Sequence, residues 1–168
     1  MPLRRGRRDD GGTHYQMREK MFAIGDDFWI ENDAGERAFK VNGKALRIRD
    51  TLVFEDPSGA DLFSVQEKKL HVRDTMEIER DGRTVATVKK ALITPLRDRF
   101  AIEVEGGEDM EAKGNIADHE YKIERGGNTV AEVSKRWFRV RDTYGIEIVE
   151  GQEDALILAV TVCIDRMS

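Results

Sequence analysis

An apolar stretch near the C-terminus constrains the fold of this chain more than any other feature. It covers residues 155–164, Ala-Leu-Ile-Leu-Ala-Val-Thr-Val-Cys-Ile, and nine of these ten residues are apolar. A surface helix would carry an apolar stripe of roughly 100° and a charged back, and a membrane-spanning helix would need about 20 apolar residues. We therefore predict a helix at about 153–166 that is buried on all sides, with Glu153 or Asp154 capping its start.

The chain before this helix contains six repeats of a hairpin-like unit. Each unit has an apolar residue followed by glutamate, and the spacings between units are 24, 24, 24, 21 and 23 residues. The six pairs are Ile30-Glu31, Phe54-Glu55, Ile78-Glu79, Ile102-Glu103, Ile123-Glu124 and Ile146-Glu147. A second apolar residue two positions earlier gives the period-two alternation of a strand with one buried face. We expect the glutamates to point outward and to keep the strands soluble.

Turn residues divide the repeats into twelve predicted strands. These strands cover about 15–24, 28–31, 36–41, 51–55, 61–67, 75–80, 83–89, 99–105, 110–116, 120–125, 128–134 and 144–149. A closed barrel leaves no edge strand, and twelve strands enclose more space than side chains alone can fill. An α-helix about 10–12 Å across suits that space. We predict a mainly β domain at 14–168, a twelve-stranded antiparallel closed barrel enclosing the hydrophobic C-terminal α-helix.

Three groups of residues resemble the LURP-one-related family. They are Tyr15-x-Met17-x-x-Lys20, Phe28-Trp29-Ile30-x-x-Asp33-x-Gly35-x-x-x-Phe39-x-Val41-x-Gly43 and Asp56-x-x-Gly59-x-x-Leu62-x-x-Val65. That family shares the Tubby C-terminal fold, a twelve-stranded barrel threaded by a helix, and phospholipid scramblases are similar to it. The resemblance covers about residues 15–166 and implies this fold. Tubby itself binds phosphoinositides, but none of its headgroup-binding motifs can be matched here, so the resemblance implies little about activity.

The alternation of strands sorts the charged residues between two barrel ends. We call the end with the short turns after each apolar-Glu pair the hairpin end, and the end with the Arg-Asp connections the connection end. Acidic residues gather at the hairpin end, and the helix should run from there to the connection end, as its macrodipole favours. Basic residues gather at the connection end. The predicted ligand-binding residues there are Lys68, Lys69, Arg73, Lys89, Lys90, Arg97, Arg99, Lys135, Arg136, Arg139 and Arg141.

This basic end predicts a binding or scaffold module for an anionic ligand. An anionic phospholipid, such as a phosphoinositide headgroup or an anionic membrane surface, is the first candidate. A nucleic acid or a protein partner is an alternative, and a hydrolase that uses barrel-end carboxylates is another. A structural interpretation also stays open, in which each arginine pairs with a turn aspartate and the lysines are solvated.

Two aromatic residues, Trp137 and Phe138, follow Lys135 and Arg136 in the connection before the last strand. An aromatic pair flanked by cations suits insertion at a membrane interface or stacking on bases. The alternative interpretation is a plug that closes the barrel mouth over the C-terminus of the helix.

Other features argue against common catalytic classes. His14, His71 and His119 lie in separate segments without the spacing of metal ligands, so we expect no metal site. The usual nucleophile and phosphate-loop signatures are absent, and we expect neither a cofactor nor an enzyme. The single cysteine, Cys163, excludes an intrachain disulfide, which favours a cytoplasmic protein, in solution or peripheral at a membrane.

The first thirteen residues carry Arg4, Arg5, Arg7 and Arg8 and have no apolar core. They do not resemble a secretory signal. We expect a disordered basic arm at 1–13, and a tether to a membrane or a nucleic acid is its functional alternative.

Overall fold

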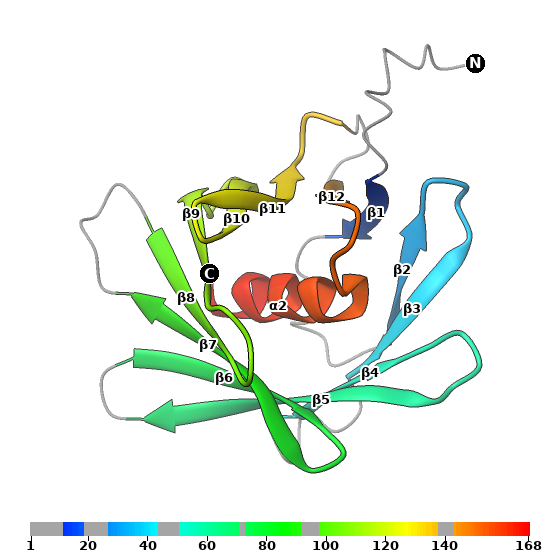
Figure 1. The fold of residues 1–168 in the computed structure, drawn as a ribbon. Helices are drawn as coiled ribbons and strands as arrows, with labels where there is room; N and C mark the ends of the chain where they lie inside the picture. Colours follow the sequence, from blue (N-terminus) through cyan, green and yellow to red (C-terminus); the bar gives the residue numbers. More distant parts are fainter. Residues whose placement is uncertain (1–11, 19–26, 44–50, 71–72, 92–97, 138–142) are drawn as a thin grey trace.

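The computed structural model describes residues 12–18, 27–43, 51–70, 73–91, 98–137 and 143–168 (Figure 1). Almost all of the predicted basic arm lies outside these ranges. Twelve strands and one helix are present in the described chain. Their bounds are β1 Thr13–Arg18, β2 Phe28–Asn32, β3 Arg37–Asn42, β4 Thr51–Glu55, β5 Asp61–Leu70, β6 Arg73–Arg80, β7 Arg83–Ala91, β8 Asp98–Val104, β9 Met110–Asn115, β10 Glu120–Arg125, β11 Asn128–Ser134, β12 Thr143–Ile148 and α2 Asp154–Met167.

The strands form a closed antiparallel barrel, as the sequence predicts. Each strand pairs with its neighbours along the chain, and β1 closes the barrel against β12, where Tyr15 lies opposite Ile146. The first strand begins earlier than expected, at Thr13, and the second half of its predicted span lies outside the described residues. β5 extends to Leu70, beyond its predicted end. Closure leaves no unpaired strand edge for another chain to extend.

The apolar-Glu pairs occupy a recurring place in the barrel. The apolar members are at most 1% exposed, which confirms the predicted alternation. In four hairpins the register also shifts at this pair, between Ile30 and Glu31, Phe54 and Glu55, Ile78 and Glu79, and Ile123 and Glu124. Such β-bulges bend a strand and increase its twist, and repeated bulges help a sheet to close. The apolar member therefore marks the inward face in all six units, and in four of them the pair also marks the point where the strand bends.

The helix α2 lies inside the barrel (Figure 1). Nine consecutive residues, 156–164, are buried, and the hydroxyl of Thr161 donates a 2.9 Å hydrogen bond to the Ile157 carbonyl oxygen. The predicted buried helix is thus confirmed, with bounds one residue later than expected. Glu153 holds the N-cap position, but its carboxylate contacts Arg80 instead of the helix backbone. Asp154 lies in the first turn and Arg166 in the last, which suits the helix dipole.

Polar side chains from the barrel hold both ends of the helix. At the hairpin end the contacts are Tyr15 Oη to Asp154 Oδ2 at 2.7 Å, Arg125 Nη1 to Gln152 Oε1 at 2.8 Å, and Arg80 to Glu153. At the connection end they are His119 Nε2 to Asp165 Oδ1 at 2.7 Å, Lys90 Nζ to the Met167 carbonyl oxygen at 3.4 Å, and Arg166 Nη2 to Glu67 Oε2 at 3.9 Å. These contacts fix the position of α2 along the barrel axis.

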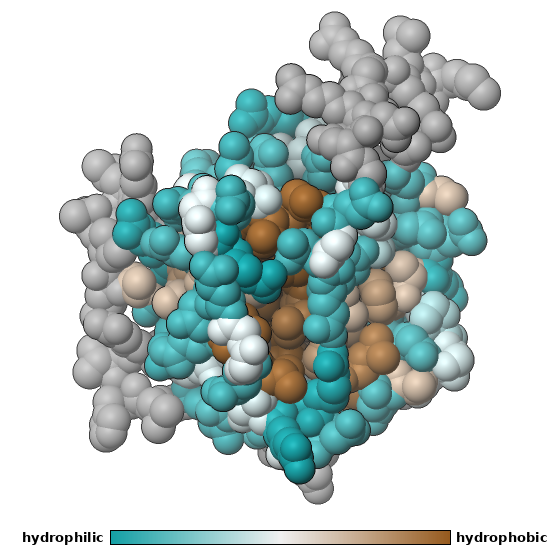
Figure 2. Space-filling model, viewed as in Figure 1, coloured by the Kyte–Doolittle hydropathy of each residue, from teal (hydrophilic) through white to brown (hydrophobic). Residues whose placement is uncertain are grey.

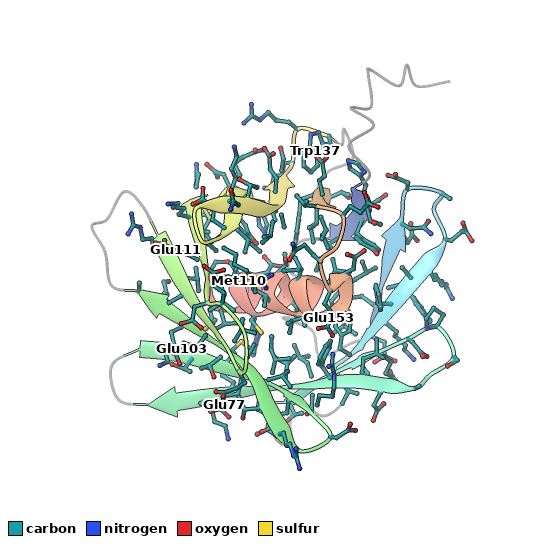
Figure 3. The ribbon with its side chains drawn as sticks, viewed as in Figure 1. Glu77, Glu103, Met110, Glu111, Trp137 and Glu153 are labelled. Atoms are coloured by element: carbon teal, nitrogen blue, oxygen red, sulfur yellow. The ribbon has the colours of Figure 1, made fainter. Side chains whose placement is uncertain are left out.

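The surface in front of α2 contains both hydrophobic and hydrophilic residues. Figure 2 shows hydrophobic residues in the middle of this face and hydrophilic residues around them. Met110 and Glu153, labelled in Figure 3, lie beside the helix in the same view. Arg125 Nη2 lies 3.3 Å from the Met110 sulfur, so a cation from the barrel covers apolar side chains near the helix N-terminus.

Candidate anion-binding surface

The described part of the connection end includes seven of the predicted binding residues with their side chains. Arg97, Phe138, Arg139 and Arg141 lie outside the described residues. For Lys69 and Arg73 the structure describes the backbone, which pairs β5 with β6. Lys68 is half-buried beside them. The remaining predicted residues differ in what they contact.

Three predicted cations form ion pairs on the outer face of the barrel. The pairs are Lys89 with Glu103 at 2.9 Å, Arg99 with Glu111 at 3.2 Å, and Arg136 with Glu120 at 3.3 Å. Exposed ion pairs of this kind contribute only about 0.2–1 kcal/mol each. For Lys89 and Arg99, whose carboxylate partners are 51% and 39% exposed, loss of the pair would therefore cost little stability.

Lys90 has a different role. It continues the inward-facing series of Ala86 and Val88 on β7, and its ammonium group lies 3.4 Å from the Met167 carbonyl oxygen. A cation at a helix C-terminus satisfies a free carbonyl and interacts favourably with the dipole. The side chain of Lys90 thus serves the helix.

Glu120 organises the chain where β11 ends. Its carboxylate accepts hydrogen bonds from Ser134 Oγ at 2.8 and 3.0 Å, from the Lys135 backbone N–H at 3.0 Å and from Arg136 Nε at 3.3 Å. The Ser134 hydroxyl in turn accepts the Arg136 backbone N–H at 3.1 Å. Two predicted binding residues, Lys135 and Arg136, therefore belong to one compact donor set. Ser134 and Glu120 were missed by sequence reasoning, because neither belongs to a motif.

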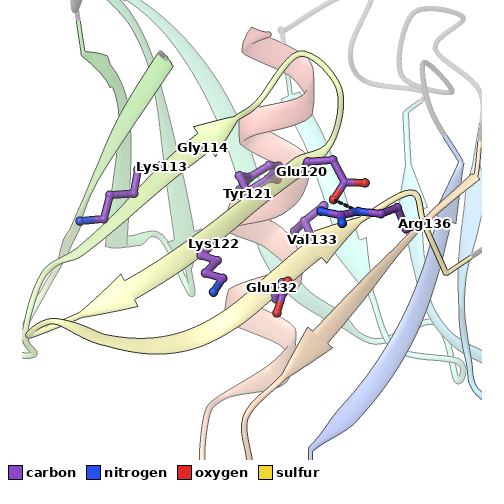
Figure 4. A pocket seen from close by; sticks show the side chains of 8 residues that line it. All are labelled: Lys113, Gly114, Glu120, Tyr121, Lys122, Glu132, Val133 and Arg136. Carbon is purple, nitrogen blue, oxygen red and sulfur yellow. Dashed lines mark hydrogen bonds and ion pairs between the residues drawn. The ribbon is translucent and has the colours of Figure 1, made fainter. Parts of the chain in front are cut away.

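A shallow pocket lies beside this donor set on the outer face of β9, β10 and β11 (Figure 4). Its volume is about 230 Å³, less than the ≈ 300–1,000 Å³ of pockets for drug-sized ligands. The residues that line it are Lys113, Gly114, Glu120, Tyr121, Lys122, Glu132, Val133 and Arg136. Three of these side chains are cationic and two are anionic, so the pocket carries a formal charge of +1.

Gly114 explains part of the pocket's shape. Its φ is +138°, and a Cβ atom there would lie 2.8 Å from the Glu120 carbonyl oxygen and 2.9 Å from the Tyr121 Cα. Only glycine accommodates both the backbone conformation and the close approach of β10. The strands can therefore approach closely at the pocket.

Trp137 lies on the outer face beside β1. Its side chain is 42% exposed, and its ring meets His14 edge-on with 6.3 Å between the ring centroids. The imidazole nitrogens of His14 lie 3.7 Å from Asp33 and 3.6 Å from Glu147. The predicted plug over the helix C-terminus would need this indole at the connection-end mouth, but the structure places it against the barrel wall next to Arg136.

Two buried ionisable side chains of the barrel, Cys163 and Tyr121, keep their protons. Cys163 is fully buried, and burial raises the pKa of its thiol far above the ordinary range, so it stays protonated. Burial, followed by the nearby Asp165 charge, raises the pKa of Tyr121 well above 10.0. Among the residues that the structure describes, His, Cys, Asp and Glu form no group of three that could hold a metal ion. The helix in the described part of the chain is not long and apolar enough to cross a membrane.

The fold and its surface define a class of protein, a closed β-barrel filled by its own C-terminal helix, with polar groups that face outward. The chain belongs to the LURP-one-related family, whose sequence profile matches residues 13–165. It is 30% identical over 151 residues to the uncharacterized protein YxjI of Bacillus subtilis (strain 168), covering 90% of this chain and 91% of that protein. The fold is also similar to the X-ray structure of a protein from Arabidopsis thaliana. There the TM-score is 0.70, the identity is 16%, and the match covers 92% of this chain and 90% of the other.

Proposed function

We propose that this protein is a non-enzymatic binding module whose connection end and adjoining outer face take up an anionic phospholipid. The observation that carries the proposal is the state of the described cations. Lys89 and Arg99 pair with exposed carboxylates, and such pairs exchange readily. The guanidinium of Arg136 is exposed, although its partner Glu120 is only 24% exposed. Because α2 fills the barrel interior, a ligand has to bind on the outside or at the ends.

The exposed indole of Trp137 favours a membrane surface as the source of the anion. Trp side chains prefer the interface between water and lipid, where the ring is partly buried and its N–H stays hydrated. Arg136, the preceding residue, is also exposed. Each lysine or arginine near an anionic membrane surface contributes about 1 kcal/mol to binding. A few such cations would therefore support reversible attachment of the protein to the membrane.

Co-sedimentation with vesicles tests the proposal. The full chain should pellet with phosphatidylcholine vesicles that contain phosphatidylinositol bisphosphate, and it should stay in solution with vesicles of phosphatidylcholine alone, both at physiological salt. The variant Arg99→Gln/Arg136→Gln should lose most of this binding. Arg83→Gln, which removes an exposed cation at the hairpin end, is the matched control and should bind normally. Equal, negligible binding to both vesicles would contradict the proposal.

A fluorescence measurement tests whether Trp137 enters the membrane interface. The chain has two tryptophans, so Trp29→Phe leaves Trp137 as the sole indole. Its emission should shift to the blue on addition of the anionic vesicles. A blue shift with single-stranded DNA and none with vesicles would favour the nucleic-acid alternative, because exposed aromatics next to cations also stack on bases.

A further inference from the structure

The hydrogen-bond donors around Glu120 are arranged to bind an anion, and the carboxylate of Glu120 itself occupies them. Three groups from consecutive residues, the Ser134 hydroxyl, the Lys135 backbone N–H and the Arg136 guanidinium, all donate to one carboxylate. This combination of a hydroxyl, a backbone amide and an arginine is also what binds phosphate oxygens in proteins. The set is preassembled, because the Ser134 hydroxyl accepts the Arg136 backbone N–H at 3.1 Å.

The carboxylate that occupies these donors can leave them. Glu120 is the first residue of β10, and its side chain is 24% exposed, while that of Arg136 is 82% exposed. Figure 4 shows the contact between these two side chains at the edge of the group of residues that line the pocket. A glutamate that swings outward regains hydration, so its displacement leaves no buried charge behind.

The surroundings favour an anion with more charge than a carboxylate. Lys113 and Lys122 line the same pocket, and without the Glu120 carboxylate its formal charge rises from +1 to +2. A phosphate monoester carries about −1.5 to −2 charges and three acceptor oxygens. Its three oxygens match the three donors, which a carboxylate with two oxygens cannot do. The lysines add positive charge nearby, although Lys113 also pairs with Glu124 at 3.0 Å. The pocket's volume suits a group of this size.

We propose that the Ser134–Arg136 segment is a phosphate-monoester site, and that Glu120 occupies it as a built-in competitor until such a ligand displaces it. The inference rests on the proposed function only in taking a phosphorylated lipid headgroup as one source of the phosphate. A soluble phosphate would use the same donors. The competitor sets a threshold for binding, so that weakly charged surfaces do not engage the site.

Titration of the full chain with inorganic phosphate, at constant ionic strength against chloride, tests the proposal. The readout is the movement of the Lys135 and Arg136 backbone amide signals in NMR spectra. Glu120→Gln should tighten phosphate binding by about tenfold, the size of one charge-assisted hydrogen-bond competitor. Glu132→Gln removes the same charge from the same pocket but leaves Glu120 on its donors, and it should change the affinity by less than about twofold.

Two further variants keep the test decisive. Glu120→Asp retains the charge but shortens the side chain, so it should increase the affinity for phosphate by less than Glu120→Gln does. This variant replaces Glu120→Gln in the test if Glu120→Gln does not fold. Adding Ser134→Ala to Glu120→Gln should remove most of the gain. The proposed site would be overturned if Glu120→Gln and Glu132→Gln changed the affinity for phosphate equally. It would also be overturned if phosphate did not move the Lys135 and Arg136 amide signals of Glu120→Gln.

Vesicles separate this inference from the proposed function. If the protein binds phosphatidylinositol bisphosphate vesicles but Glu120→Gln does not bind them more tightly, the phosphate-monoester site is wrong and the membrane function stands. If Glu120→Gln binds inorganic phosphate and none of the proteins binds vesicles, the phosphate-monoester site stands with a soluble ligand and the membrane function is wrong.

Discussion

The Nε2 atom of His119 lies 2.7 Å from Oδ1 of Asp165, and this contact ties the β9–β10 connection to the last turn of α2. The two side chains are only 10% and 6% exposed. His119 also packs against the Tyr144 ring, with 4.3 Å between the centroids. The contact therefore joins the connection-end wall of the barrel to the helix that fills it.

Removing the imidazole should destabilise the protein strongly. His119→Ala leaves the Asp165 carboxylate in a buried position without this partner, and such losses cost about 3–5 kcal/mol. Urea unfolding followed by circular dichroism measures the change in the free energy of unfolding. His14→Ala is the control, because His14 forms only looser, half-exposed pairs, and it should cost below about 1 kcal/mol. Equal losses in the two variants would argue against a role for the buried contact.

The hydrogen bond between Tyr15 and Asp154 predicts a pH dependence of stability. Burial, then the hydrogen bond to Asp154 and then its charge, raise the pKa of the Tyr15 hydroxyl far above its ordinary 10.0. The folded state thus keeps this proton at pH values where the unfolded state loses it, so the contribution is complete below pH 10.0 and declines as the pH rises above it. The free energy of unfolding should fall less steeply above this pH in Tyr15→Phe than in the wild type. If the free energy of unfolding fell equally steeply with pH in both proteins, Tyr15 would not be the source of this pH dependence.

A charge in the middle of the helix should abolish the fold. Val160 is fully buried, and an unpaired buried carboxylate costs several kcal/mol, a large part of a domain's total margin of about 5–15 kcal/mol. We expect Val160→Asp to lack a cooperative thermal transition in calorimetry. Val149→Asp places the same side chain at an exposed valine and should unfold close to the wild-type temperature. A normal transition for Val160→Asp would contradict the packing of α2 inside the barrel.

Gly114→Ala should destabilise the barrel through a backbone clash. The added methyl would lie 2.8 Å from the Glu120 carbonyl oxygen and 2.9 Å from the Tyr121 Cα at a φ of +138°, and we expect a loss of about 2–4 kcal/mol in urea unfolding. Gly35 also has a positive φ, +75°, but open space around it. Gly35→Ala therefore measures the strain of the backbone alone, which should be about 1 kcal/mol. A loss no larger at Gly114 than at Gly35 would show that β10 moves away freely.

The sequence predicts the barrel well because its signals are local and repeated. Ile78 and Glu79 alternate in the manner of a half-buried strand, and Asp81-Gly82 follows as a hairpin turn, so each unit can be interpreted from a few adjacent residues. The bulge between Ile78 and Glu79 could not be predicted in this way, since it depends on the pairing with β7. The expected cap at the helix start also failed, because Arg80 of the barrel wall contacts Glu153.

The candidate site was predicted only in part. The clustering of lysine and arginine at one end follows from counting strands, which is why Lys135 and Arg136 could be named in advance. The period-two alternation of β7 predicts that Lys90 faces inward with Ala86 and Val88, so the sequence itself separates Lys90 from the outward-facing cations. Glu120 gave no signal of its own, because a single glutamate at the start of a strand is common on any surface.

The sequence by itself determined the number of strands, their inward faces and the burial of the last helix, since hydrophobic periodicity and turn residues act over a few neighbouring positions. Only the tertiary structure decided which side chains meet. Trp137 contacts His14 because closure of the barrel brings β12 beside β1. Ser134 reaches Glu120 because the pairing of β10 with β11 sets Tyr121 opposite Val133. Both contacts depend on strand pairing, which joins residues that are far apart in the sequence or on separate strands and therefore leaves no local signal.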